Sequence, residues 1–117
     1  MPDDKDVFDK DEALEIIQDD EEFLKELVEM LITDFPEQMS RIKEAVDGRD
    51  SEALRKSAHE LKGAVANFGE KAVFKTALEL EMMGKNNRLD DVEKTYGVLV
   101  ENVEHLEKAL RMFVGAE

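Results

Sequence analysis

His59 lies among basic side chains in a segment with helical periodicity. Arg55 and Lys56 precede it by four and three residues, Lys62 follows it by three, and Gly63 comes next. On a helix of roughly 100° per residue, His59 lies roughly 140° from the centre of the apolar face. That apolar face is formed by Leu54, Ala58, Leu61, Val65 and Phe68. The pattern predicts an exposed imidazole bordered by cations.

This combination of residue types suits phosphoryl transfer. Neighbouring cations disfavour an imidazolium, so the ring keeps a nitrogen lone pair near neutral pH, and they attract a dianionic group. Accepting a phosphoryl group depends mainly on positioning and on stabilising charge on its equatorial oxygens. Arg55 and Lys56 would supply a local positive field. The alternative is an ordinary solvated histidine, and helical-wheel geometry leaves it open.

Gly63 supports the functional interpretation. A glycine inside a helix costs about 1 kcal/mol relative to alanine, so we expect a compensating reason for it. Close approach of another backbone or of a ligand is the usual one. One turn from His59, a missing side chain would leave the imidazole standing clear of its surroundings.

The rest of the chain predicts an all-α protein that positions this helix. The 117 residues include two Pro and six Gly, and no stretch alternates apolar and polar residues. We expect an up-down antiparallel four-helix bundle with a short additional N-terminal helix. The first helix would run over 10–18 with a capping box of Asp9 and Glu12. The others would begin near Asp19 and end at Gly48, run from 50 or 51 to Gly69, run over 70–84, and start at a cap of Asp90 and Glu93.

Apolar stripes define the expected core faces. The first helix would bury Ala13, Leu14, Ile16 and Ile17. In the second, one stripe continues across Pro36, which predicts a kink rather than a break, and it comprises Phe23, Leu24, Leu27, Met30, Leu31, Phe35, Met39, Ile42 and Val46. The seam of the last helix comprises Val92, Tyr96, Leu99, Val103, Leu106, Leu110 and Phe113. His105 falls beside this seam and is expected on the surface.

Composition excludes several classes of function. The formal charge of −14 argues against a general nucleic-acid binder and against anionic membranes. With no Cys, no disulfide framework or thiolate metal site is possible. We expect one soluble, cytoplasmic, monomeric domain over 1–117, with 1–8 as an acidic, mobile leader. Met1 and this leader favour a free-standing protein over a piece of a larger kinase.

The segment from Ala58 to Gly69 resembles the signature of the histidine-containing phosphotransfer (HPt) domain family. That signature is His-x-Leu-Lys-Gly, then small residues, an apolar residue and Gly, and here it reads AHELKGAVANFG. The resemblance implies that His59 is phosphorylated on Nε2, that Lys62 contacts the phosphoryl oxygens and that Gly63 leaves room for the partner. Leu80-Glu81 matches a motif in which the Glu orients the His through Nδ1, although an ordinary solvated or ion-paired carboxylate is the alternative.

The resemblance also implies a function and partners. The chain would be a phosphorelay intermediate that exchanges its phosphoryl group with the aspartate of a response-regulator receiver domain, or with a hybrid histidine kinase. Mg²⁺ would belong to the receiver, and the chain would need no cofactor of its own. Without a Gly-rich phosphate loop, we expect a phosphocarrier rather than an enzyme. Docking would use the face around His59 and apolar residues such as Ile16 or Ile17.

Two alternatives remain. The chain could be a helical adaptor that binds a receiver or kinase without being phosphorylated. It could also be a carboxylate-bridged metal bundle, which uses Glu-x-x-His from facing helices. The metal bundle is disfavoured, because Lys56 and Asn102 occupy the positions three before His59 and His105.

Overall fold

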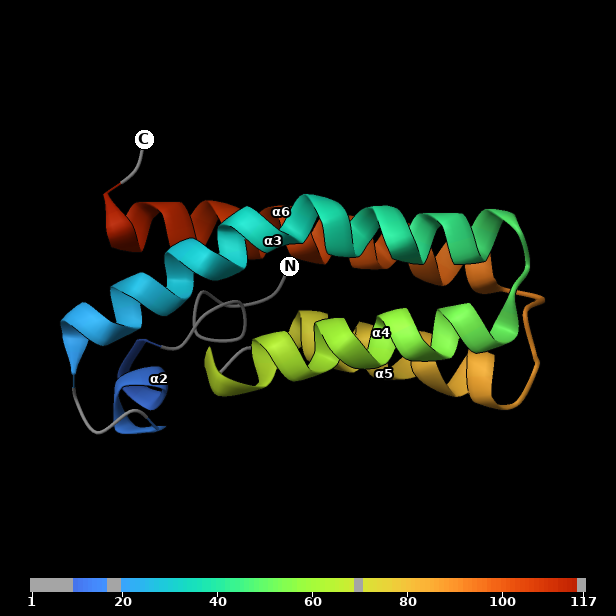
Figure 1. The fold of residues 1–117 in the computed structure, drawn as a ribbon, viewed down its shortest axis with the longest axis horizontal. Coiled ribbons are helices and arrows are strands. Elements are labelled where there is room, and N and C mark those ends of the chain that lie inside the picture. Colours follow the sequence, from blue (N-terminus) through green and yellow to red (C-terminus); the bar gives the residue numbers. More distant parts are fainter. Residues whose placement is uncertain (1–9, 17–19, 69–70, 116–117) are drawn as a thin grey trace.

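The computed structural model describes residues 10–16, 20–68 and 71–115. Four long helices form an antiparallel bundle in which α4 packs against α3 and α5, and α6 packs against α5 and α3 (Figure 1). The short helix α2 contacts one end of this bundle, at η1 and α3. The elements are α2 (Lys10–Ile16), α3 (Glu21–Asp47), α4 (Ser51–Val65), the 3₁₀ turn η1 (Ala66–Phe68), α5 (Ala72–Lys85) and α6 (Val92–Val114). The expected fold class is confirmed.

Local capping explains where α3 begins and ends. The Asp20 carboxylate accepts a hydrogen bond from the Phe23 backbone N–H at 3.0 Å, and the helix ends at Gly48 as expected. The helix continues through Pro36, which confirms continuity. Because Pro36 has no N–H, one helical hydrogen bond is lost, and α3 changes direction along its length (Figure 1).

The core follows the expected stripes with two corrections in α3. Phe23 and Met30 are exposed, whereas Val28 and Ala45 are buried. Met30 precedes the buried Leu31 by one residue, and a rotation of roughly 100° takes its side chain to the edge of the stripe. On α6 the expected seam is confirmed, with five members buried and Tyr96 and Phe113 packed against them. Those five are Val92, Leu99, Val103, Leu106 and Leu110.

The short helix α2 covers one end of the bundle. Ala13 is fully buried and Leu14 packs against the core. The expected leader, the cap at Asp9, the side chains of Ile16 and Ile17, and Gly69 lie outside the described residues.

The boundary between α5 and α6 differs from the prediction. Gly84 is buried inside α5, which extends to Lys85, rather than terminating the helix. The N-cap of α6 is Asp91, which makes no side-chain capping bond, so the capping box of Asp90 and Glu93 does not form. Glu93 instead pairs with Arg49 at 3.1 Å, and Arg49 also donates to the Leu89 carbonyl at 2.9 Å. These contacts tie together the two connections at that end of the bundle.

A polar contact joins α5 to α6. The Asn102 amide donates to the Thr76 hydroxyl at 2.8 Å, and Thr76 in turn donates to the Ala72 carbonyl at 2.8 Å. Because Thr76 is buried, we expect Asn102→Ala to lower the free energy of unfolding by about 1 kcal/mol in urea titrations. Glu101→Ala, on the exposed side of the same helix, should change it by less than about 0.5 kcal/mol. Equal effects of the two substitutions would contradict a stabilising role for this contact.

Candidate functional site

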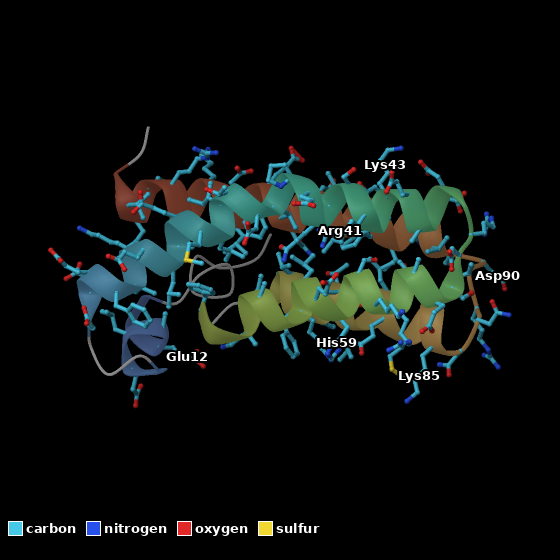
Figure 2. All side chains as sticks on the ribbon, in the orientation of Figure 1. Glu12, Arg41, Lys43, His59, Lys85 and Asp90 are labelled. Carbon is cyan, nitrogen blue, oxygen red and sulfur yellow. The ribbon has the colours of Figure 1, made fainter. Side chains whose placement is uncertain are left out.

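The site is built on α4, whose start and core face are defined locally. The Asp50 carboxylate caps the helix by accepting from the Ala53 N–H at 3.1 Å. The expected core face is confirmed, since Leu54, Ala58, Leu61, Val65 and Phe68 are all buried. His59 consequently faces outward with its side chain 61% exposed, and in Figure 2 it lies on the side of α4 away from α3.

A single carboxylate holds both His59 and Lys62. The Nδ1 of His59 lies 3.0 Å from Oε2 of Glu81, on the neighbouring helix α5. The Nζ of Lys62 lies 2.8 Å from the other oxygen, Oε1. A carboxylate only accepts hydrogen bonds, so the Nδ1 of His59 must carry the proton. In the neutral ring the lone pair therefore lies on Nε2, the nitrogen away from Glu81.

The electrostatics of Glu81 favour this arrangement. Its side chain is 15% exposed, and burial by itself would raise the pKa of the carboxyl. Hydrogen bonds from Lys62 and His59, with the charges behind them, outweigh burial and lower the pKa below its ordinary value of 4.5. Glu81 is therefore ionised near neutral pH and accepts from both neighbours.

This lowered pKa predicts a pH dependence of stability. A carboxyl whose pKa is lower in the folded state contributes stability above its unfolded pKa, and that contribution is lost as the pH falls. Between about pH 5 and pH 3, the native protein should lose stability relative to Glu81→Gln, by at most about 1.4 kcal/mol per pH unit. Urea titrations of both proteins across this range give the difference. If the free energies of unfolding of the two proteins changed with pH in the same way, the lowered pKa of Glu81 would be contradicted.

Gly63 leaves open space next to His59. A Cβ placed on Gly63 would have no atom within 4 Å outside its own helix, so no neighbour within the described chain requires a glycine there. Packing among the described residues therefore does not explain Gly63. The expectation of clearance for a partner is compatible with this open space and stays a prediction.

The other two cations do not join the carboxylate. Arg55 pairs with Glu52 through two hydrogen bonds, of 3.0 and 2.7 Å. Lys56 lies on the α3 side of α4, where it lines a hollow of about 500 Å³ together with Glu60. The three cations expected around His59 are thus divided among three environments. Of these, Lys62 is the one that shares a carboxylate with His59.

Glu60 is also turned away from the site. The sequence places it next to His59, but its carboxylate lies 3.6 Å from Arg41 on α3, on the side opposite α5. The negative charge of Glu60 is therefore paired with Arg41, on the side of α4 that faces away from the imidazole.

Gly84 is a structural feature of the site that the sequence-based prediction missed. A Cβ on Gly84 would lie 2.5 Å from the Ser51 carbonyl oxygen and 2.7 Å from the Arg55 backbone nitrogen. The backbones of α4 and α5 therefore approach closely one turn from His59. The sequence carried one signal for this contact. If α5 is taken to end at Lys85, Gly84 lies inside the helix, where a glycine lowers helix stability relative to alanine and so needs a structural reason.

Two other features are absent from the residues that the structure describes. Within residues 10–16, 20–68 and 71–115, no three acidic or histidine side chains gather closely enough to hold a metal ion. Over the same part of the chain, no helix has the length and apolar character needed to cross a membrane.

The fold and the site together define a class of protein: an antiparallel helical bundle that presents an imidazole, oriented from behind by a carboxylate, on its outer surface. The sequence matches the Hpt domain family over residues 26–109. The chain belongs to this family, as the motif around His59 suggested.

Two known proteins are similar over most of the chain. "Phosphorelay intermediate protein rdeA" of Dictyostelium discoideum is 26% identical over 106 residues, which make up 91% of this chain and 42% of that protein. The chain thus spans less than half the length of this relative. The crystal structure of the HPT domain from a Shewanella Hpt sensor hybrid histidine kinase superposes with a TM-score of 0.85 at 20% identity, covering 97% of each chain. This likeness shows that the fold is shared.

Proposed function

We propose that this chain is a phosphorelay intermediate that accepts a phosphoryl group on Nε2 of His59 and exchanges it with the aspartate of a receiver domain. The observation that carries the proposal is the 3.0 Å contact between His59 Nδ1 and Glu81, combined with an imidazole that is 61% exposed. Membership of the Hpt family and the similarity to a phosphorelay intermediate support it.

The transfer step follows from the tautomer. The Nε2 lone pair forms a bond to phosphorus while the bond from phosphorus to the aspartyl oxygen breaks, and its electrons return to the partner's carboxylate. The proton stays on Nδ1, so the ring becomes a phosphoimidazolium with one positive charge. Glu81 accepts the Nδ1–H throughout and stabilises this charge as it develops. The reverse step returns the phosphoryl group to an aspartate.

Lys62 would act in two ways during this step. Paired with Glu81 at 2.8 Å, it helps to hold the carboxylate against Nδ1. Its side chain is 20% exposed and lies one turn after His59, so rotation of its flexible stem would bring Nζ toward phosphoryl oxygens on Nε2. Gly63, beside it, would leave space for the partner's active site.

The receiver supplies what this chain lacks for the reaction. It would provide the aspartate with an acidic pocket and its Mg²⁺, while this chain provides nucleophile, cation and docking surface without a cofactor or catalytic turnover of its own. The partners would be response-regulator receivers or hybrid histidine kinases. Exchange with them would take place in the cytoplasm.

The test uses the chemical stability of the phosphoryl bond. The protein is incubated with a receiver domain charged by radiolabelled acetyl phosphate, and the labelled product is treated with acid and with base. We expect label on this chain that is acid-labile and base-stable, as phosphohistidine requires. A chain that binds the receiver but gains no label would be a non-phosphorylated adaptor, and the proposal would fail.

A further inference from the structure

Helix α5 exposes apolar side chains beside the site. Leu78 and Met82 are 37% and 40% exposed, and Phe74 is half-buried against the core. These three residues follow each other at intervals of four, so they form one strip on the helix surface. Leu78 precedes Glu81 by three residues and Met82 follows it directly. The α5 strip, meaning Phe74, Leu78 and Met82, therefore borders the carboxylate that holds His59.

The pairing of α4 with α5 sets the register of this strip. Glu81 lies level with His59, and Gly84 lies level with the turn from Ser51 to Arg55, so the helices are antiparallel. At 1.5 Å per residue, Leu78 lies about 4.5 Å and Phe74 about 10.5 Å from Glu81 along the axis of α5.

The facing end of α4, with η1 after it, carries two small exposed residues. By the same register, Leu78 is level with Lys62 and Phe74 is level with Ala66 of η1, and both Ala66 and Gly63, the residue after Lys62, are exposed. The surface beside the strip thus carries Lys62 and two residues with little or no side chain, Gly63 and Ala66.

The charge of the molecule is distributed unevenly. Helices α4 and α5 together carry five Lys or Arg against four Asp or Glu, whereas α3 alone carries eight acidic residues against three basic ones. Two of the four carboxylates on α4 and α5 are paired within the same surface, Glu81 with Lys62 and Glu52 with Arg55. In a chain of net charge −14, helices α4 and α5 therefore repel an acidic partner less than α3 does.

We propose that the α5 strip is part of the surface on which the receiver domain docks; this inference rests on the proposed function. A stable interface buries about 800 Å² per partner, a patch roughly 16 Å in radius. A receiver whose aspartate reaches Nε2 of His59 must cover such a patch around it, and all three strip residues lie within that radius along α5. The partner would place apolar side chains next to its acidic pocket, against Leu78 and Met82.

The test compares substitutions on two helices. Leu78→Glu places a charge in the proposed interface, and Leu78→Ala removes apolar area without adding charge. Val98→Glu is the matched control, because Val98 is 45% exposed on α6 and receives the same charge. Each variant is assayed for phosphoryl gain from a charged receiver domain that phosphorylates the native chain. Each is also assayed with phosphoramidate, a small donor that needs no docking surface.

We expect Leu78→Glu to slow transfer from the receiver at least about tenfold, and Leu78→Ala to slow it several-fold. Both variants should react with phosphoramidate at the native rate, and Val98→Glu should be native in both assays. Native transfer from the receiver to both Leu78 variants would overturn the docking surface while leaving the proposed function intact. If the native chain gains no phosphate from either donor, the proposed function itself fails.

Discussion

Replacing His59 with glutamine will reduce phosphoryl gain to background with either a charged receiver domain or phosphoramidate. The glutamine amide has no nucleophilic nitrogen lone pair, so no stable bond to phosphorus forms. The His59 side chain is largely exposed, and the substitution removes one side-chain hydrogen bond. We therefore expect the free energy of unfolding to change by no more than about 1 kcal/mol. Radiolabel incorporation and a urea titration measure the two effects.

His105 provides the matched control, because the chain contains two histidines. It is exposed on α6, and it lines a surface hollow with Glu101, Glu104 and Lys108. His105→Gln should gain phosphate at the native rate. Label retained by His59→Gln, or lost in His105→Gln, would falsify the assignment of the acceptor.

Replacing Gly84 with alanine will destabilise the fold, although alanine is the better helix former. The new Cβ would meet two backbone atoms, the Ser51 carbonyl oxygen at 2.5 Å and the Arg55 nitrogen at 2.7 Å. Backbone atoms cannot move out of the way as a flexible side chain can, so helices α4 and α5 must move apart. Forcing extra volume into a packed contact costs about 1–3 kcal/mol, and we expect a loss of about 2 kcal/mol from the free energy of unfolding in urea.

Two other glycines test the cause of that loss. Gly63 and Gly97 lie within helices, and a Cβ on either would have no neighbour within 4 Å outside its own helix among residues 10–16, 20–68 and 71–115. Gly63→Ala and Gly97→Ala should therefore raise the free energy of unfolding by about 0.5–1 kcal/mol. If Gly84→Ala were equally stabilised, the close approach of the two helices would be refuted.

The Gly84 substitution should also affect transfer. Gly84 follows Glu81 by three residues, so separating the helices withdraws the carboxylate from Nδ1 of His59. We expect slower phosphoryl gain from phosphoramidate in Gly84→Ala, with a native rate in Gly97→Ala. A native rate in both variants would show that the helix contact does not position Glu81.

The helices, and the faces they bury, follow from the sequence because both depend on local properties. Hydrophobic periodicity and capping residues act within a few residues, and this locality explains the confirmed start of α4 and the seam of α6. The same locality made His59, Lys62 and Gly63 recognisable, since all three lie within two turns of one helix. Glu81 was found through the resemblance of Leu80-Glu81 to a family motif, because no periodicity links it to His59.

Tertiary structure decided which contacts form between helices. The pairing of Lys62 with Glu81 and the burial of Gly84 both depend on the register and separation of α4 and α5. Neither quantity is encoded in one helix, since each arises from how two packed surfaces fit together. The sequence by itself thus determined which imidazole is exposed, with a lysine and a glycine one turn after it. Only the packed bundle placed the Glu81 carboxylate at Nδ1 of His59 and determined which cation shares that carboxylate.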